Sequence, residues 1–482
     1  MVINADINCK QEIIENMIRI ITMLLILSGT IVTLKAKNTT SPNIIVIFTD
    51  DQGYQDMGCF NSPKINTPNL DKMATEGLLC TSFYVSSSVC TPSRASLLTG
   101  RYSVNNGVGG VIFPGGKGMS PDEVTIAEML KTIGYKTACI GKWHLGDKVE
   151  TLPLAQGFDE YYGIPYSNDM YIGGDQKFDD DVVFLEEYTM VKAKADQEFN
   201  LKYSKNRKKI KERGIKELCP LFEGNEIVEY PCNQATLTKR YFERAMSFID
   251  KADSKPFFLY ITPAMPHVPL FASDKFKGTS ERGLYGDVLE EIDHYTGKLL
   301  EHLKKSGLDE NTLVIYTSDN GPWLGYKDHG GSALPLRDGK FSNYEGGVRV
   351  PCVMRWPGTI KANQLSNEIL STIDFLPTIA HYTGAKLPQV KIDGINIANH
   401  IENVKKSTKR DVMMYTKGTN YFGIRKGDWK YLPYSGARKA KSDSLVPELF
   451  NLIDDISETT NLADKYPKKV KELQELMDKM ME

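Results

Sequence analysis

The sequence predicts an α/β fold in which a large, mainly parallel β-sheet lies between layers of helices. Two observations predict it: four short apolar runs are typical of buried strands, and segments with a helical pattern stand between them. Strands that alternate with helices favour parallel pairing with both faces of the sheet covered. With 482 residues, of which 41% are hydrophobic, the chain is long enough to bury such a core.

The predicted strands are residues 43–48, 136–140, 256–261 and 312–316. Each is a short, mostly apolar run, as expected of a strand buried on both faces. Helices are predicted at residues 68–76, 125–132 and 285–303. The first begins with a proline and ends before a glycine, and the last has apolar residues at a helical period.

The pattern changes after about residue 403. Residues 423–432 (GIRKGDWKYL) are typical of two strands joined at Gly427-Asp428, and residues 466–481 of an amphipathic helix. We therefore expect a main domain over residues 43–403 and a small C-terminal α+β subdomain over residues 404–482. The charge-rich stretch 176–217 predicts an inserted surface helix or flap, for which a solvated face is favoured over a substrate-binding arm.

The charge balance excludes one class of protein. Lysine and arginine number 59 and aspartate and glutamate 61, which gives a net charge of −2. General nucleic-acid binders are strongly basic, so we expect no nucleic-acid partner. A locally basic pocket for a small anion remains compatible with this balance.

Residues 20–34 form the only long apolar run, which is shorter than the roughly 20 residues of a bilayer-spanning helix. Arg19 precedes the run and Ala36 follows it, a pattern typical of a signal peptide over residues 1–36. The sixteen residues before Met17 carry three acidic side chains, so Met17 is an alternative start. We expect an exported protein without stable membrane association after cleavage. An uncleaved anchor is the alternative.

Export would allow disulfide bonds. Cys219 and Cys232 flank a short loop-like stretch and are the best candidates for a pair. Sequence does not fix pairing, so free buried cysteines remain the alternative.

Polar side chains follow all four predicted strands. In open α/β sheets, ligands bind outside the carboxyl ends of the strands. These residues are Asp50, Asp51, Lys142, His144, His267, Asp319 and Asn320. The sequence therefore predicts a site at one edge of the sheet that combines carboxylates, a lysine and two histidines.

The oxygen donors of this set suit a hard cation. Asp50, Asp51, Asp319 and Asn320 offer the ligands that calcium or magnesium prefers, and adjacent carboxylates repel each other without a compensating cation. Aspartate and asparagine also favour turns and helix caps. For Asp50-Asp51 alone or Asp319-Asn320 alone, a turn or cap is therefore the alternative to a metal site.

Cys90 lies where a helix is predicted to start, with Pro92 at its first position and Gly100 at its end. A helix N-terminus favours anions and lowers the pKa of a thiol. Taken alone, this position allows a nucleophilic cysteine or a buried one.

Residues 90–101 (CTPSRASLLTGR) closely resemble the signature of the sulfatase family, in which a maturation enzyme oxidises the cysteine to formylglycine. Other segments resemble that family in the same order along the chain, over about Asn43 to Asp464. They are residues 49–53 (TDDQG), 66–74 (NTPNLDKMA), 141–146 (GKWHLG), 266–269 (PHVP), 317–322 (TSDNGP), 339–340 (GK) and 344–351 (YEGGVRVP). Residues 163–169 (GIPYSND) and 278–287 (GTSERGLYGD) are similar to the arylsulfatase A and N-acetylgalactosamine-6-sulfatase branch.

The resemblance implies a role for each residue. The formylglycine made from Cys90 would be hydrated to a geminal diol that attacks sulfur and later expels sulfate. A calcium ion, with magnesium as the alternative, would be held by Asp50, Asp51, Asp319, Asn320 and the modified Cys90. Arg94 would hold the diol and the carboxylates, and Lys142 and Lys340 would neutralise sulfate oxygens. His267 would protonate the leaving alcohol, and His144 would take a proton from the sulfated diol.

The resemblance also implies an alkaline-phosphatase-like fold and an exported enzyme, periplasmic or secreted, that removes sulfate from a carbohydrate. Galactose or N-acetylgalactosamine is the expected sugar. Ser167, His329 and Arg337 are the candidate substrate contacts, the last two because residues 328–340 lead to Lys340. The alternatives are a formylglycine-dependent phosphonate or phosphate ester hydrolase and a non-catalytic binder of sulfated glycans.

Overall fold

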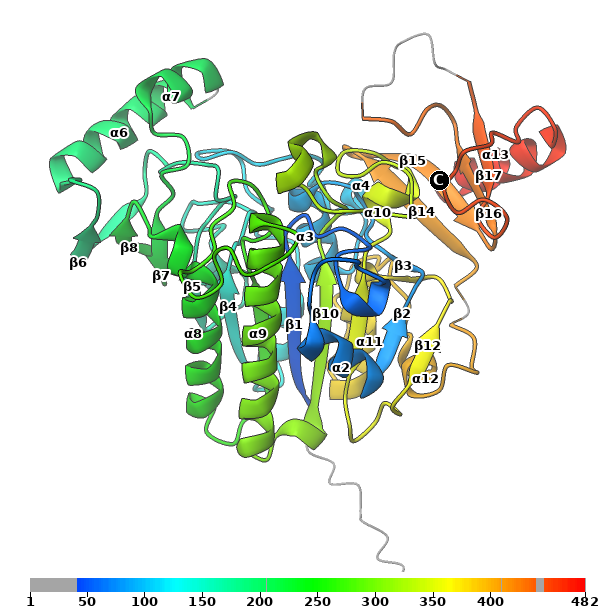
Figure 1. Cartoon of the computed structure of the whole chain (residues 1–482), viewed down its shortest axis with the longest axis horizontal. Coiled ribbons are helices and arrows are strands. Elements are labelled where there is room, and N and C mark those ends of the chain that lie inside the picture. The colour runs from blue at the N-terminus through cyan, green and yellow to red at the C-terminus, as the bar shows by residue number, and fades with distance from the viewer. Residues whose placement is uncertain (1–40, 205, 409, 439–445, 482) are drawn as a thin grey trace, which may run out of the picture. The chain divides into compact units, whose positions relative to one another are not determined.

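The computed structural model describes residues 41–204, 206–408, 410–438 and 446–481. Within them, eleven strands form one sheet in the order β12-β2-β11-β10-β1-β9-β4-β5-β7-β8-β6 (Figure 1). In that order the strands are β12 Gln364–Ser366, β2 Leu78–Cys80, β11 Cys352–Arg355, β10 Thr312–Ser318, β1 Asn43–Thr49, β9 Phe257–Thr262, β4 Lys136–Gly141, β5 Glu160–Gly163, β7 Leu221–Glu223, β8 Glu226–Tyr230 and β6 Lys177–Phe184.

The centre of the sheet consists of the four predicted strands. β10, β1, β9 and β4 are neighbours and pair in parallel, so their carboxyl ends meet at one edge. Thr49 pairs with Ser318, and Gly141 pairs with Thr262. The predicted alkaline-phosphatase-like class, a large mixed and mainly parallel sheet between helices, is confirmed.

The alternation of side chains along β1 shows how the two faces are filled. Ile44, Val46 and Phe48 belong to one hydrophobic cluster, and Ile45 and Ile47 belong to the other. Successive side chains of a strand point to opposite faces, so a strand covered on both sides is apolar at every position.

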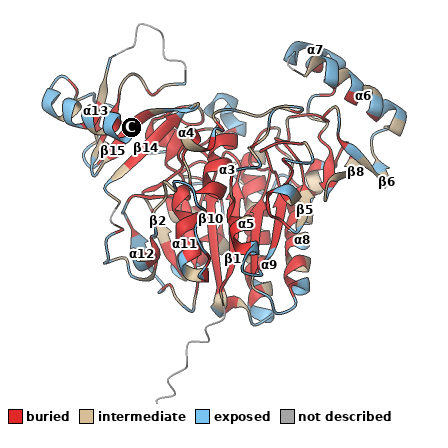
Figure 2. Ribbon diagram, turned by 180° about the vertical axis from the view of Figure 1, so that it is seen from behind, coloured by how far each residue is buried: buried red, intermediate tan, exposed pale blue. Residues whose placement is uncertain are grey.

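Helices cover both faces of the sheet. The helices α2 (Pro68–Thr75), α8 (Leu237–Lys251) and α9 (Leu284–Lys305) lie on the face turned forward in Figure 1. The helices α3 (Cys90–Thr99), α5 (Ile126–Lys131) and α11 (Phe375–Thr383) lie on the other face, which Figure 2 shows. Thr125 and Glu128 form a reciprocal capping box at the start of α5. The predicted helices at 68–76, 125–132 and 285–303 are confirmed within two residues at each end.

The remaining helices and short strands lie mainly around this core. The helices are α4 Ser103–Asn106, α6 Met190–Tyr203, α7 Arg207–Arg213, α10 Glu345–Val348 and α12 Ala398–Glu402, and the 3-10 turns are η1 Gly58–Phe60, η2 Pro153–Gln156, η3 Gln234–Thr236, η4 Asp309–Asn311, η5 Leu324–His329 and η6 Thr372–Asp374. β3 (Phe83–Tyr84) pairs with β13 (Leu370–Ser371). The predicted insertion 176–217 contains α6 and α7, whose outer surfaces are largely exposed (Figure 2).

A separate antiparallel sheet follows in the order β14-β15-β16-β17, with strands Val412–Lys417, Asn420–Lys426, Trp429–Leu432 and Glu448–Asn451. The predicted hairpin is β15–β16, turning at Gly427-Asp428. α13 (Pro467–Met481), the predicted terminal helix, packs on this sheet through Leu473 and Met477. Both sheets belong to the compact unit Ser41–Glu482, and the boundary proposed near residue 403 stays a prediction.

Both predictions about export, the signal peptide and the lack of stable membrane association, stay predictions. The signal peptide over residues 1–36 lies outside the described residues. Among the described helices, none combines the length and apolar character needed to cross a bilayer.

Cys219 and Cys232 are both buried, and their Sγ atoms lie 3.3 Å apart without a bond. The backbone N–H of Cys232 donates to the carbonyl of Cys219 at 2.9 Å. The predicted neighbours therefore meet as two thiols.

A buried ionic cluster joins the helix α10 to the C-terminal sheet. The ammonium of Lys430, on β16, lies 2.9 Å from Glu345 and 2.8 Å from Glu458, and all three residues are fully buried. Burial tends to raise the pKa of Glu345, but Lys430 and two arginines outweigh it and lower this pKa to about 2. Burial raises the pKa of Glu458 to about 7, because Lys430 only partly offsets it and Glu345 adds repulsion.

We expect the variant Glu458→Gln to gain stability relative to the wild type as pH rises from 5 to 8. A carboxyl group whose pKa is higher in the folded than in the unfolded state stabilises the fold at a pH below its unfolded-state pKa. This stabilisation is lost as the pH rises through the folded-state pKa. For Glu458 the two pKa values are 4.5 and about 7. This difference corresponds to a change of about 3 kcal/mol at most in the free energy of unfolding. Thermal unfolding across this range measures the difference. The exposed control Glu475→Gln should have the same pH dependence of stability as the wild type. The same result for Glu458→Gln would contradict the prediction.

Candidate active site

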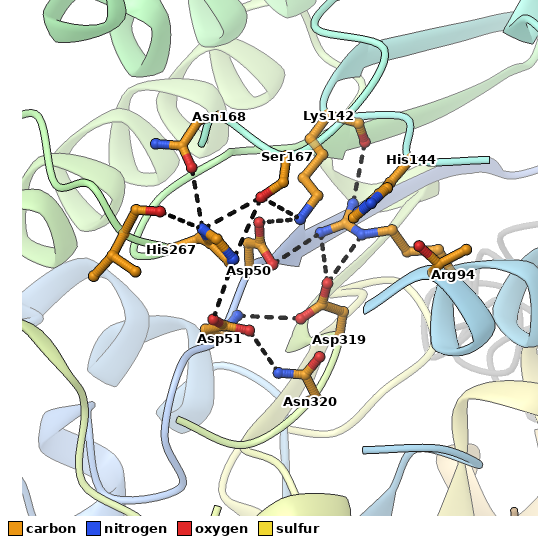
Figure 3. Close-up of polar contacts among 12 residues, drawn as sticks. Asp50, Asp51, Arg94, Lys142, His144, Ser167, Asn168, His267, Asp319 and Asn320 are labelled. Atoms are coloured by element: carbon orange, nitrogen blue, oxygen red, sulfur yellow. Dashed lines mark hydrogen bonds and ion pairs between the residues drawn. The ribbon is translucent and has the colours of Figure 1, made fainter. Parts of the chain in front are cut away.

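The predicted strand-end residues meet at one edge of the sheet (Figure 3). Asp50 and Asp51 follow β1, and Asp319 and Asn320 follow β10. Lys142 and His144 follow β4, and His267 follows β9. All seven are buried, and Arg94 and Cys90 reach them from α3.

Cations hold the two inner carboxylates. The Lys142 ammonium forms an ion pair with Asp50. Arg94 donates from Nε to Asp319 Oδ2 at 2.9 Å, and its Nη2 forms an ion pair with the same oxygen at 2.8 Å. Burial would raise the pKa of Asp50, but Lys142, His267 and Arg94 outweigh it and lower this pKa. Burial and repulsion by Asp50 raise the pKa of Asp319 to about 7. Burial and the neighbouring carboxylate therefore oppose ionisation of Asp319 unless a cation binds beside it.

A second cation reaches the outer carboxylate. Lys340 Nζ lies 2.5 Å from Asp51 Oδ1, which also accepts from Asn320 Nδ2 at 2.7 Å. The backbone N–H of Asp51 donates to Asp319 Oδ1 at 3.1 Å. Asp51 raises the pKa of Lys340, although burial opposes this. Each of the two adjacent aspartates is therefore paired with its own lysine, Asp50 with Lys142 and Asp51 with Lys340.

Three oxygens at the centre suit a metal ion. Asp50 Oδ1, Asp51 Oδ2 and Asn320 Oδ1 are buried and accept no hydrogen bond within the described residues. Buried acceptors without partners are costly and rare. Ligand atoms of Asp50, Cys90 and Asp319 lie within 4.8 Å of one another, as do those of Asp50, Asp51 and His267. Oxygen donors in this number fit calcium or magnesium.

Cys90 is the first residue of α3, so the helix begins two residues earlier than its proline position predicts. Gly100 ends the helix in the left-handed region, as expected. The expected lowering of the thiol pKa is wrong. Burial raises it, and Asp50 and Asp319 add to this against Lys142 and Lys340. An unmodified Cys90 is therefore a neutral thiol and a poor nucleophile.

The hydrogen bonding of His144 leaves its Nδ1 as an acceptor. Its Nε2 lies 3.2 Å from the carbonyl oxygen of Ile112, so this nitrogen carries the hydrogen. Its Nδ1 is buried and makes no hydrogen bond within the described chain. Burial and Lys142 lower its pKa well below the usual value, which keeps the ring neutral.

His267 has the opposite arrangement. Its Nδ1 faces two acceptors, the carbonyl of Val268 at 2.6 Å and Asn168 Oδ1 at 3.1 Å, so Nδ1 carries a hydrogen. Its Nε2 lies 3.7 Å from Asp51 Oδ2, toward the centre of the site. Any proton given to a substrate therefore comes from Nε2. Asn168 was missed from the sequence, although it stands beside Ser167 in the segment 163–169.

Backbone strain marks three positions in or beside the site. Asp51, His144 and Phe341, the residue after Lys340, adopt φ values of 65°, 62° and 71°. Residues other than glycine rarely adopt this left-handed region, and such strain persists at functional sites where the surrounding structure enforces it.

The three candidate substrate contacts lie in different surroundings. Ser167 Oγ lies 3.4 Å from Lys142 Nζ and 3.3 Å from the ring nitrogens of His267, inside the site. His329 is exposed on η5. Arg337 instead donates to the carbonyl of Glu458 at 2.6 Å and stacks on Tyr344, so it ties the loop before Lys340 to the C-terminal region.

The family model described as Sulfatase matches residues 42–385, and a model of the N-sulphoglucosamine sulphohydrolase C-terminal region matches residues 337–482. The chain is a member of the sulfatase family. Sulfatases are sulfuric ester hydrolases, so this sulfatase is an enzyme of that class.

Named relatives agree. The sulfatase is 39% identical to human arylsulfatase A over 81% of its own length and 74% of the relative. It is 35% identical to N-acetylgalactosamine-6-sulfatase of Mus musculus over 85% of its length and 75% of the relative.

Solved structures share the fold. The PsFucS1 sulfatase of Pseudoalteromonas sp. superposes with a TM-score of 0.77 at 29% identity, covering 93% of this sulfatase and 91% of the other chain. Ps i-CgsB, solved in complex with k-i-k-neocarrahexaose, has a TM-score of 0.71 at 31% identity. The match covers 92% of this sulfatase and 93% of the other chain. A phosphonate monoester hydrolase of Agrobacterium radiobacter, at 18% identity and a TM-score of 0.63, shares the fold alone.

Proposed function

We propose that this sulfatase is an exported enzyme that hydrolyses O-sulfate esters of carbohydrates, through a formylglycine made from Cys90 and a bound calcium ion. Sulfated galactose or N-acetylgalactosamine in glycans is the proposed substrate. One observation carries the proposal: Cys90 lies beside Asp50 and Asp319 in a site where buried oxygens of Asp50, Asp51 and Asn320 accept no hydrogen bond within the described residues. Lys142 and Lys340 pair with Asp50 and Asp51 in the same site.

A bound cation and an oxidised residue 90 would supply distinct chemistry. A cation held by Asp50, Asp51, Asp319, Asn320 and residue 90 would polarise the sulfate and lower the pKa of the nucleophile. An aldehyde at position 90 would supply, once hydrated, a hydroxyl that the neutral Cys90 thiol does not provide.

The other side chains act on charge and protons. Lys142 and Lys340 neutralise sulfate oxygens, and Arg94 holds Asp319 in place. His267 donates a proton from Nε2 to the leaving oxygen, because an alkoxide leaves poorly near neutral pH. His144, neutral and with a free Nδ1, accepts the proton that must be removed before sulfate departs. Ser167 orients both Lys142 and His267.

The substrate class rests on relatives. N-acetylgalactosamine-6-sulfatase is named for its sugar, and Ps i-CgsB was solved in complex with k-i-k-neocarrahexaose. Export rests on the apolar run 20–34, and a formylglycine-generating or radical enzyme is the proposed maturation partner.

The deciding experiment has two parts. Mass spectrometry of the peptide that contains Cys90, from protein made in its own host, should show a species about 18 Da lighter than the thiol form. The same protein should release sulfate from an aryl sulfate far faster than phosphate from the matched aryl phosphate. Faster phosphate release would favour the phosphonate or phosphate ester hydrolase instead. An unmodified cysteine without sulfate release would favour a non-catalytic glycan binder.

We expect chelation to lower both activity and thermal stability. Removing the cation leaves the adjacent buried carboxylates of Asp50, Asp51 and Asp319 without the ion that would offset their repulsion, so calcium should raise the Tm of the chelated protein in a concentration-dependent manner. Comparing calcium with magnesium identifies the ion that fits. Asp319→Asn should reduce the rise in Tm that calcium produces. A wild-type Tm that does not depend on calcium would count against a metal at this site.

A further inference from the structure

An aromatic surface leads outward from the reaction centre. The ring of Trp323, four residues after Asp319, lies 5.7 Å from the ring of His267. Lys340 Nζ lies 4.9 Å from the centroid of Trp323. Both proposed groups that handle the sulfate ester therefore touch one half-buried aromatic side chain.

Phe341 extends this surface. Its ring meets Trp323 edge to face at 5.4 Å, and its backbone N–H donates to the carbonyl of Ser88 at 2.9 Å, close to Cys90 in the chain. Its φ of 71° is strained for an aromatic residue. The fold thus holds this ring beside Lys340 at a conformational cost, which indicates a role at the site.

Arg438 completes the surface from the C-terminal region. Its guanidinium carbon lies 4.4 Å over Phe341 and 5.6 Å from the centroid of Trp323. Gly436 fixes this segment, since its carbonyl accepts from Asn343 N–H at 2.9 Å and from Ser342 Oγ at 3.0 Å. We name Trp323, Phe341 and Arg438 the outer rim.

Burial decreases along this path. The Lys340 side chain is 2% exposed, Trp323 and Phe341 are half-buried, and Arg438 is exposed. Within the described parts of the chain, Arg438 contacts these rings rather than a carboxylate. A planar guanidinium held on aromatic faces keeps its hydrogen-bond donors free and matches carboxylate and sulfate geometry.

We propose that the outer rim binds the sugar next to the one that loses its sulfate, and that Arg438 binds a second anionic group on that sugar. This group is a carboxylate or a sulfate, and the Trp323 ring packs against the apolar face of a sugar. The inference rests on the proposed function, since it names the kind of glycan that the same site prefers. Arg438 and Trp323 are then specificity-determining residues.

The test uses matched disaccharides. One carries the target sulfate and a neighbouring uronate, and the second is its methyl ester, which removes only the negative charge. A third carries a second sulfate in place of the carboxylate. A monosulfated aryl ester measures sulfatase activity without a neighbouring sugar.

The wild type should prefer the acid over the methyl ester, and Arg438→Gln should reduce that kcat/KM ratio about ten- to a hundredfold, mainly through KM. Arg438→Lys should give an intermediate ratio, because it keeps the charge but not the planar, stacked donor group. Trp323→Leu should weaken binding of both the acid and its methyl ester. Lys479→Gln, which removes a charge on α13, should keep the wild-type ratio.

The outcomes separate the two proposals. A wild type that cleaves the aryl ester but shows no preference between acid and methyl ester, or an Arg438→Gln variant that keeps the preference, would overturn the outer-rim inference alone. A wild type that releases sulfate from none of these substrates would overturn the proposed function as well. Preference for the disulfated over the carboxylated disaccharide, lost in Arg438→Gln, would identify the second anion as a sulfate.

Discussion

Cys90→Ala is expected to lower kcat/KM for every sulfate ester by about 10⁴- to 10⁶-fold, the loss typical of removing a nucleophile from an intact site. Alanine offers neither a thiol to oxidise nor a hydroxyl to attack. The remaining lysines and cation site should still bind sulfate esters, so the loss should appear in kcat more than in KM.

The structure supplies a matched control for this variant. Cys59 is a second free cysteine, half-buried in η1. Cys59→Ala should keep its activity, and both variants should unfold at temperatures close to the wild type. A Cys90→Ala protein with activity near that of the wild type would rule out residue 90 as the nucleophile.

His267→Ala is expected to slow alkyl sulfate esters by about 10²- to 10⁴-fold while affecting aryl esters less. An alkyl alcohol needs a proton as it leaves, whereas an acidic phenol departs as its anion. Only Nε2 faces the site, because Val268 and Asn168 bind the hydrogen on Nδ1. Asn168→Ala should therefore produce a weaker form of the same selective loss.

Steady-state kinetics on a series of esters with leaving groups of graded pKa measure this effect. The dependence of kcat on leaving-group pKa should steepen in His267→Ala and stay unchanged in His294→Ala, a substitution on the outer helix α9. Equal losses across the series would remove the general-acid role from His267.

The sequence predicted the centre of the fold because that centre obeys local rules. β1, β9, β10 and β4 are short apolar runs that end in polar residues, and parallel pairing alone brings those ends together. The edge strand β6 was not predicted. Its sequence KFDDDVVF is charged and half exposed, and it pairs only because β8 lies beside it.

Side-chain roles that depend on distant partners were less predictable. Arg337 stands close to Lys340 in the chain, but its partner Glu458 is 121 residues away. The predicted shift of the Cys90 pKa had the wrong direction. The helix N-terminus can be recognised in the sequence, whereas complete burial beside two carboxylates cannot. Asn168 carries no distinguishing pattern of its own and is recognised only by its contact with His267.

All ten residues of α3 are buried, from Cys90 to Thr99. A second enzyme cannot place this segment in its own catalytic cleft once the sheet and helices have closed around it. On the proposed function, maturation is therefore ordered in time: oxidation of Cys90 precedes folding. Each molecule would receive one opportunity for activation, so the active fraction of a preparation would record how maturation competed with folding during synthesis and export.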